Sequence, residues 1–314
     1  MKVGFLGLPG SGKTTLFNVV TGRELDPSEI GRAEARLAVV RVPDERVERV
    51  AEVFDSPQRT QPEVTFVDLM ALHTGNEHAQ RDDSLTKVAG DADAFALVVQ
   101  CFGALDHRGE ALDPSSDLEA LLLEMTITDL GVVERRLKRI AAETKAEKDL
   151  MNFERDLLED VAEQLEEGGL VKDMELTEEH ERMLRGFNLL TSKPLLVVFN
   201  VGEEDLRART CTGACRLAEE AGLQWIPVSA GLEQELAELD DETQAEFLAE
   251  YGLDAPARDR FIRACYDLLD VITFFTANEN EARGWTISAG ATAREAAGKV
   301  HSDMYEGFVR AEVI

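Results

Sequence analysis

The sequence predicts an α/β fold in which helices cover a largely parallel sheet. Apolar runs of strand length alternate along the chain with segments of helical periodicity, which is typical of α/β domains. These runs lack the apolar–polar alternation of half-exposed strands, so we expect them to be buried on both faces. They span residues 3–7, 64–68, 94–102, 194–200 and 224–230, and residues 37–42 form a further expected strand.

A long charged stretch separates the runs at 94–102 and 194–200. From Ser116 to Leu190 the chain holds no proline, and apolar residues recur at intervals of three and four, as on one face of a long helix. This stripe consists of Leu130, Val133, Leu137 and Ile140, followed by Leu150, Phe153, Leu157, Val161 and Leu165. We expect an antiparallel helical hairpin, a coiled coil, inserted into the α/β domain. A pair of ordinary surface helices is the alternative.

The composition changes again after a predicted helix that follows Pro256. Two short β-like runs, VITFFTA and ARGWTI, precede a helical segment, TAREAAGKV, and a strand-like run, GFVRAEVI. They indicate a small α+β module that ends inside a strand, so we expect this module to be truncated. The expected domains are residues 1–115 with 191–271 for the α/β domain, 116–190 for the hairpin and 272–314 for the partial module.

The charge and hydropathy of the chain limit its classes of partner. The net charge of −29, with a pI near 4.5, argues against broad binding to phosphate backbones, although a small ribosomal contact stays compatible with it. No apolar run is long enough to span a membrane, and the first residues, MKVGFLGLPG, are typical of a strand entering a loop rather than of a signal peptide. We therefore expect a cytoplasmic protein with no membrane partner, and find no sign of sequence-specific nucleic-acid binding.

The first strand leads into a phosphate-binding loop. Residues 7–14, GLPGSGKT, match G-x-x-x-x-G-K-[ST], in which glycines let successive backbone N–H groups face a phosphate. In this motif Lys13 reaches the terminal phosphates as the catalytic cation, and the Thr14 hydroxyl ligates Mg²⁺. The helix that starts at Lys13 adds the positive end of its dipole. The expected phosphate-binding residues are Pro9, Gly10, Ser11, Gly12, Lys13, Thr14 and Thr15.

Asp68 is the second expected magnesium ligand. It ends the strand at 64–68, where an aspartate of P-loop enzymes holds the metal through water. An aspartate that only caps the following loop is the alternative. Ala71 then occupies the position where most nucleotide switches keep a glycine. Its N–H can still bind a γ-phosphate, although its Cβ limits the freedom of the backbone.

The ends of the last two strands are typical of a base-binding site. Guanine-nucleotide switches have N-K-x-D at the first of these places, whereas this chain has NVGE, with Asn200, Val201 and Glu203 as candidate contacts. Because guanine recognition needs a bidentate acceptor at a fixed reach, Glu203 weakens the expectation of GTP specificity. The run VSA fits the final base-contacting loop, through the backbone N–H groups of Ser229 and Ala230.

Together these motifs resemble the YchF/Obg-like ATPase family over nearly the whole chain. Among the segments that carry the similarity are GLPGSGKTTLFN, VRVPDERVERVAEVF and PQRTQPEVTFVD. The similarity is dense at AELDDETQAEFLAEYGL and throughout the C-terminal module, and weak at residues 25–36 and 70–90. The resemblance implies a P-loop G domain, a helical hairpin insert and a C-terminal TGS module, here the partial module at 272–314. It also implies a preference for ATP over GTP and an association with ribosomes and stress responses.

The switch segments depart from this family. The family's first switch carries CTIEP, whose threonine closes on magnesium and the γ-phosphate; that threonine falls on Arg32 here, and the cysteine falls on Gly31. Gly10 replaces the asparagine of the family's P-loop, and the second switch reads DLMALHTGNE in place of DIAGLVKGAS. Both switches are therefore rebuilt relative to the family.

The residue that orients the attacking water stays open. Leu72 stands where Ras-type enzymes keep a glutamine. The resemblance assigns this role to a histidine in the loop after the strand at 94–102, and His107 is the candidate there, with an exposed loop histidine as the alternative. His73 and His78 in the second switch are further candidates.

We expect a slow Mg²⁺-dependent ATPase, in which positioning and charge neutralisation supply most of the catalysis. A nucleotide-gated binding module that has lost hydrolysis is the first alternative, and the arginine at position 32 favours it. An ordinary GTPase switch is the second alternative.

Overall fold

The computed structural model describes residues 1–22, 36–69, 90–143, 151–208, 212–237 and 239–312. Several residues named above lie outside these ranges, so the expectations about them stay predictions: Gly31, Arg32, Ala71, Leu72, His73, His78 and Leu150.

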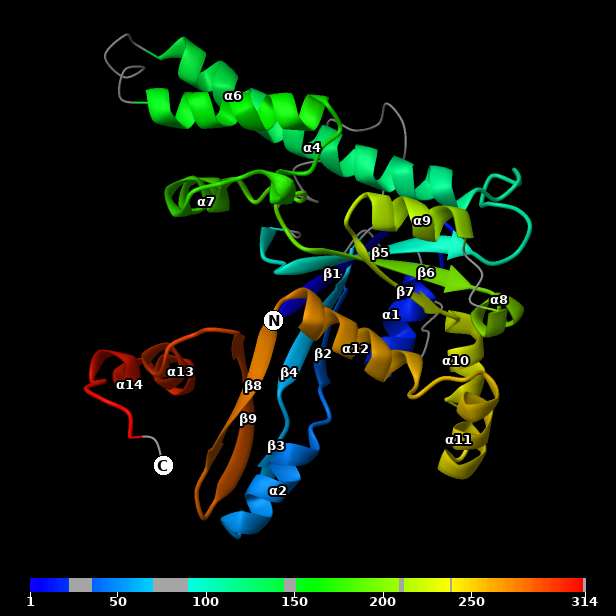
Figure 1. Ribbon diagram of the computed structural model, residues 1–314, viewed down its shortest axis with the longest axis vertical. Helices are drawn as coiled ribbons and strands as arrows, with labels where there is room; N and C mark the ends of the chain where they lie inside the picture. The colour runs from blue at the N-terminus through cyan, green and yellow to red at the C-terminus, as the bar shows by residue number, and fades with distance from the viewer. Residues whose placement is uncertain (23–35, 70–89, 144–150, 209–211, 238, 313–314) are drawn as a thin grey trace.

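The centre of the molecule is a six-stranded sheet with strand order β2-β4-β1-β5-β6-β7 (Figure 1). Its members are β1 (Lys2–Gly7), β2 (Arg36–Arg41), β4 (Glu63–Asp68), β5 (Ala94–Cys101), β6 (Leu195–Val201) and β7 (Gln224–Val228). Neighbouring strands are parallel, except that β2 runs antiparallel to β4 at the edge. The prediction of a mostly parallel α/β sheet is confirmed.

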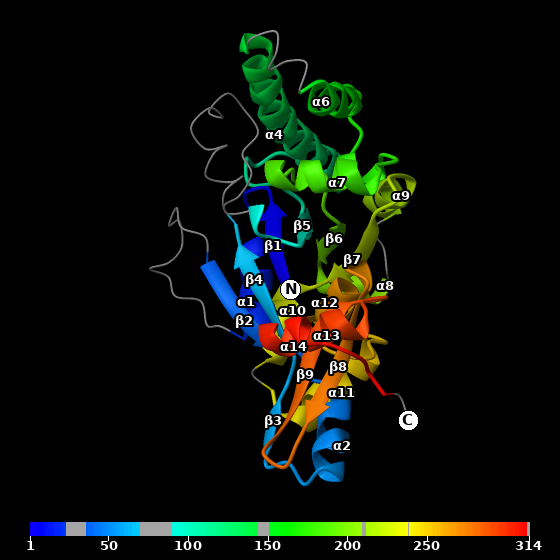
Figure 2. The ribbon, with the colours of Figure 1, turned by 90° about the vertical axis from the view of Figure 1, so that its left-hand side faces the viewer.

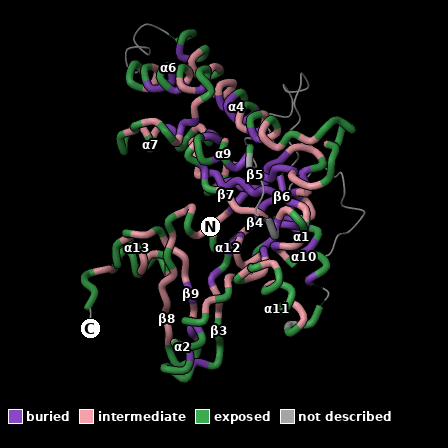
Figure 3. Tube along the Cα trace, turned by 45° about the vertical axis from the view of Figure 1, so that its right-hand side comes forward, coloured by how far each residue is buried: buried purple, intermediate pink, exposed green. Residues whose placement is uncertain are grey.

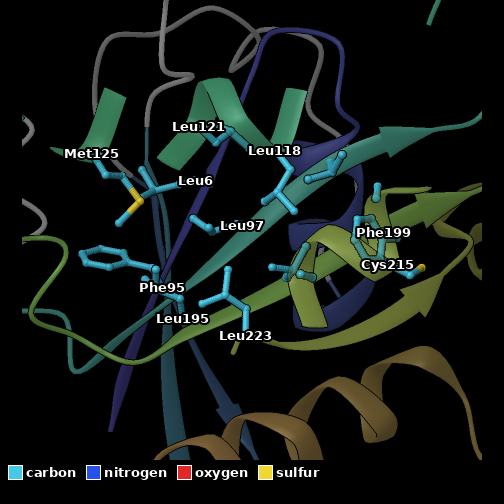
Figure 4. Packing of buried hydrophobic residues seen from close by; sticks show 14 of the residues in the cluster. Leu6, Phe95, Leu97, Leu118, Leu121, Met125, Leu195, Phe199, Cys215 and Leu223 are labelled. Carbon is cyan, nitrogen blue, oxygen red and sulfur yellow. The ribbon is translucent and has the colours of Figure 1, made fainter. Parts of the chain in front are cut away.

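One face of the sheet is covered by α4 (Pro114–Ala142), α9 (Thr212–Glu220) and α10 (Ala230–Leu236). Side chains from these helices pack on alternate residues of the strands, among them Leu97 and Phe199 (Figure 4). Because successive strand residues point to opposite faces, a strand covered on both sides needs apolar residues at every position. This explains the unbroken apolar runs of the sequence.

The other face is covered by α1 (Lys13–Thr21) and α12 (Ala257–Leu268). Three buried aromatic rings form part of its core: the ring centroid of Phe261 lies 5.1 Å from that of Phe5 and 5.5 Å from that of Phe66. These contacts fix α12 against β1 and β4. Figure 3 shows the resulting concentration of buried residues along the main sheet.

The predicted helical pair is formed by α4 and α6 (Asn152–Glu166), which project from the sheet and pack on each other (Figures 1 and 2). Its separate core includes Val133, Leu157 and Val161, and α7 (Glu178–Leu184) packs on it. The first turns of α4 instead pack on the sheet, through Leu118, Leu121 and Met125. The domain boundary at residue 116, which stays a prediction, thus falls within a helix that belongs to both cores.

Asp129 joins the hairpin to the chain that returns to β6. Its carboxylate, 1 % exposed, accepts hydrogen bonds from the backbone N–H groups of Leu190 and Thr191, each at 2.8 Å, and from the Thr191 hydroxyl at 2.6 Å. Burial raises the pKa of Asp129 to about 6, against the lowering effect of these hydrogen bonds. The bonds fix the point at which the hairpin leaves the α/β core.

A second sheet of three strands, in the order β3-β9-β8, lies at the end of the molecule opposite the hairpin (Figure 1). β8 (Val271–Ala277) and β9 (Glu281–Ser288) form an antiparallel pair, and β3 (Gln58–Thr60) joins it parallel to β9. β3 follows α2 (Glu45–Val53), whose Arg46 guanidinium lies 5.0 Å from the ring centroid of Phe275. A segment from the first 115 residues therefore completes the C-terminal sheet.

The chain ends with α13 (Ala293–Val300) and α14 (Ser302–Glu306), followed by irregular backbone. The expectation of a strand in GFVRAEVI is wrong for residues 307–312, which form none, and Val309 is 89 % exposed. A strand needs a hydrogen-bonded neighbour, and Figures 1 and 2 show this segment lying apart from the strands of the second sheet.

Candidate nucleotide-binding site

The candidate site lies at the carboxyl ends of the parallel strands. The loop at residues 8–12 follows β1, and Asp68 ends β4. Asn200 is the last residue of β6 that pairs with β7. In open α/β sheets this edge is where ligands bind. The fold therefore brings together the phosphate-loop, metal and base candidates that the sequence distributes over more than two hundred residues.

The phosphate loop has the curled backbone that its glycines predict. Gly10 and Gly12 have φ angles of 82° and 80°, in the left-handed region that favours glycine. A Cβ on Gly10 would lie 3.0 Å from the Cβ of His107, and a Cβ on Gly12 would overlap the Nδ2 of Asn200. Both positions favour glycine by their φ angles, and Gly12 in addition has no room for a side chain, whereas the contact at Gly10 is only tight.

Asn200 holds the phosphate loop to the start of α10. Its side chain is 3 % exposed; Nδ2 donates to the carbonyl of Ser11 at 3.0 Å, and Oδ1 accepts from the N–H of Ala230 at 3.1 Å. Ser229 caps α10, with its Oγ 3.5 Å from the N–H of Leu232. Asn200 and Ala230 thus bond to each other, and the idea that they contact a base stays a prediction.

The two expected magnesium ligands lie together. The Thr14 hydroxyl donates to Oδ2 of Asp68 at 3.3 Å, and Asp68 is 6 % exposed. Both groups are hard oxygen donors of the kind that Mg²⁺ takes alongside water and phosphate oxygens. The described residues hold no cluster of three or more His, Cys, Asp or Glu side chains suited to a metal. These two residues fit an ion that obtains its other ligands from water and nucleotide.

Lys13 is bound to Asp68 rather than extended into the loop. Its ammonium donates to Oδ1 of Asp68 and to the carbonyl of Leu69, and the residue is 8 % exposed. Burial lowers the pKa of Lys13, and the charge of Asp68 opposes this shift. The lysine therefore has to exchange Asp68 for phosphate when a nucleotide enters.

Arg36 is a second cation on the same carboxylate, and we did not foresee it from the sequence. Its Nη2 donates to Oδ2 of Asp68, the oxygen that also faces Thr14. Arg36 is the first residue of β2 and pairs directly with Asp68 in the antiparallel register of β2 and β4. Only the register reveals this pair, because the two residues lie 32 positions apart in the sequence.

The loop after β5 places His107 beside the phosphate loop. Gln100, 7 % exposed, donates from Nε2 to the carbonyls of Phe102 and Leu105, both at 3.1 Å. Asp106 accepts from the N–H groups of Glu110 and Arg108, and the Glu110 bond is the main cause that lowers the pKa of Asp106 to about 2. His107 itself is exposed at Gly10. This position agrees with both the catalytic role and its alternative.

The remaining base candidates lie at the end of β6 and at the start of α8 (Glu203–Ala208). Val201 is buried as the last residue of β6, and the Glu203 carboxylate accepts a hydrogen bond from the Tyr251 hydroxyl. Tyr251 caps α11 (Asp241–Glu250), so the end of α11 is bonded to the start of α8. We did not foresee this role for Tyr251, because it depends on where α11 packs.

Ser11 offers an unused polar atom inside the phosphate loop. It is 2 % exposed, and its Oγ has no hydrogen-bond partner in the structure as described. Pro9, Thr14 and Thr15 are half-buried around it. A buried hydroxyl without a partner is costly, and a phosphate oxygen would satisfy it.

No helix in the described ranges has the length and apolar character needed to cross a membrane.

Comparison with known proteins agrees with this geometry. A family model named YchF-GTPase_C, described as "Protein of unknown function (DUF933)", matches residues 271–314. The fission yeast structure titled "Structure of the Schizosaccharomyces pombe YchF GTPase" superposes with a TM-score of 0.79 at 26 % identity, covering 98 % of this chain and 86 % of that one.

Curated relatives match along the full chain. Proteins named "Ribosome-binding ATPase YchF" are 36 % identical over 320 residues in Haemophilus ducreyi and 36 % identical over 321 residues in Escherichia coli O157:H7. The Bacillus subtilis protein of that name is 33 % identical over 324 residues. Each alignment covers 100 % of this chain and 88 % of the relative. With a shared fold and an intact phosphate loop, this similarity shows that the chain belongs to the YchF family.

Proposed function

We propose that this protein binds ATP with Mg²⁺ and hydrolyses it slowly. The observation that carries the proposal is the arrangement of Gly10, Gly12, Lys13, Thr14 and Asp68 around one curled loop at the carboxyl edge of a parallel sheet. Such a loop binds phosphates through its backbone N–H groups and the N-terminus of the following helix. The relatives' name, ribosome-binding ATPase, supports the same activity.

In this proposal each residue keeps a single task. Lys13 leaves Asp68 and neutralises the terminal phosphates, while Ser11 and the loop N–H groups hold their oxygens. Thr14 and Asp68 hold Mg²⁺, which when bound neutralises the charge shared by the β- and γ-phosphates. His107, next to Gly10, orients the attacking water.

The test is single-turnover phosphate release from ATP and Mg²⁺, compared with Lys13→Ala. We expect release by the unaltered protein to exceed that of the variant by about tenfold or more, because the variant loses the cation that meets the transferring phosphate. Equal release would refute hydrolysis. Tight ATP binding without release would instead favour a nucleotide-gated binding module, in which the hairpin and the C-terminal sheet respond to the nucleotide.

We further propose that ATP is preferred over GTP. Glu203 stands in place of the aspartate that reads guanine, and its carboxylate is already engaged by Tyr251. Calorimetric titration with each nucleotide is expected to give the lower dissociation constant for ATP, and Glu203→Asp is expected to narrow the gap between the two. A preference for GTP of about tenfold, or 1.4 kcal/mol, would support an ordinary GTPase switch instead.

A ribosomal partner is the third part of the proposal. It rests on the relatives' name and on alignment along the full chain, including the C-terminal sheet. Because ribosomes work in the cytoplasm, a ribosomal partner also supports a cytoplasmic location for this protein. The acidic surface, with a net charge of −29, requires that contact with ribosomal RNA be confined to a small basic area.

A further inference from the structure

Arg36 places a positive charge on Asp68, the carboxylate of the candidate metal site. Asp68 is 6 % exposed, and its two oxygens are divided between Lys13 on Oδ1 and Arg36 on Oδ2. The oxygen that Arg36 contacts also faces the Thr14 hydroxyl, at 3.3 Å. The guanidinium therefore shares the oxygen on which the proposed magnesium site depends.

The position of Arg36 is fixed by three elements. Its backbone pairs with that of Asp68 through the β2–β4 register. Its guanidinium carbon lies 5.3 Å from the ring centroid of Phe17, a fully buried residue of α1. The side chain is only 19 % exposed. A guanidinium held by a carboxylate, an aromatic face and a sheet register is a built feature of the site rather than a loosely placed surface charge.

We propose that Arg36 is a resident cation of the nucleotide site, which replaces part of the charge neutralisation that Mg²⁺ supplies. The proposal rests on the ATP binding proposed above. When Lys13 turns toward a phosphate, Arg36 remains on Asp68, so the buried carboxylate is not left without a partner. The guanidinium also adds positive charge beside the phosphates whether or not a metal is bound.

The charge of Arg36 reduces the dependence of ATP binding on Mg²⁺ in two ways. Without Mg²⁺ the positive charge of Arg36 strengthens nucleotide binding. With Mg²⁺ the same charge competes for Asp68 and repels the ion, so the metal adds less. The affinity gain that Mg²⁺ gives ATP is therefore small with Arg36 present and large without it.

The experiment measures the dissociation constant of ATP by calorimetry, in MgCl₂ and in EDTA, for the full chain. We expect the ratio of the EDTA value to the Mg²⁺ value to be about threefold or less in the unaltered protein and at least about tenfold in Arg36→Gln. Arg36→Lys, which keeps the charge, should retain the low ratio. Arg41→Gln is the matched control, because Arg41 is the exposed residue at the other end of β2. Thermal melting of each variant checks that it folds.

The possible results separate this inference from the proposed function. A ratio in Arg36→Gln equal to that of the unaltered protein, or a high ratio in Arg36→Lys, would overturn the role of Arg36 while leaving ATP binding intact. An unaltered protein that binds ATP in neither buffer would overturn the proposed function, and the resident-cation role with it.

Discussion

Gly12→Ala is expected to lower the affinity for ATP by at least about 100-fold and the free energy of unfolding by about 3 kcal/mol. The φ of Gly12 is 80°, which costs a residue with a side chain about 1–2 kcal/mol. The new Cβ would also overlap the Nδ2 of Asn200 and displace the amide that holds the carbonyl of Ser11. The loop would then lose its curl and its support together.

The matched control for this variant is Gly222→Ala. Gly222 follows the end of α9, its φ of 63° is also in the left-handed region, and a Cβ there meets no heavy atom of the described residues within 4 Å. Gly222→Ala should lower the free energy of unfolding by only about 1 kcal/mol, the cost of a left-handed φ for alanine, and leave ATP binding unchanged. Chemical denaturation and calorimetric titration measure both effects. Equal losses of stability and of ATP affinity in the two variants would show that the contact between the new Cβ and Asn200 does not cause the effect of Gly12→Ala.

Asn200→Ala is expected to lower the free energy of unfolding by about 2–4 kcal/mol and ATP affinity by about 30-fold. The truncation leaves the carbonyl of Ser11 and the N–H of Ala230 without their partner in a buried setting, and each such group costs about 1–3 kcal/mol. It also frees the phosphate loop from the end of β6. Denaturation and ATP titration again give the two numbers.

Asn18→Ala provides the comparison for this second variant. Asn18 and Asn200 are both 3 % exposed, but neither amide atom of Asn18 has a hydrogen-bond partner within the residues that the structure covers. Its truncation removes packing without breaking such a bond, so ATP affinity should stay within about twofold of the unaltered protein. If Asn18→Ala weakened binding as much as Asn200→Ala, loss of packing rather than loss of the bridge would be the cause.

Local patterns were sufficient to predict the sheet and the curled backbone of the phosphate loop. Unbroken apolar runs predicted the parallel strands, because a strand buried on both faces needs an apolar residue at each position. The phosphate loop was recognisable because its geometry depends on a few consecutive residues, Gly10 to Thr14. The strand expected at the C-terminus failed for the opposite reason: residues 307–312 are apolar enough for a strand but lie beside no edge.

Contacts between distant segments could not be predicted from one sequence. β3 joins the C-terminal sheet although it follows α2 in the first part of the chain. Tyr251 engages Glu203 across 48 residues, and its role depends on the packing of α11. Such pairs carry no local signal, because neither partner changes the periodicity or the turn chemistry of its own segment.

The sequence by itself determined that the chain has an α/β sheet, a phosphate loop and an aspartate at the end of the strand at 64–68. These features follow from periodicity and from a short motif, in which each residue acts on its neighbours. Only the tertiary structure decided that Asn200 bridges the loop to α10 and that Arg36 shares Asp68 with Lys13. Strand register and helix packing bring these charges and amides together, and they arise from the whole fold rather than from any one segment.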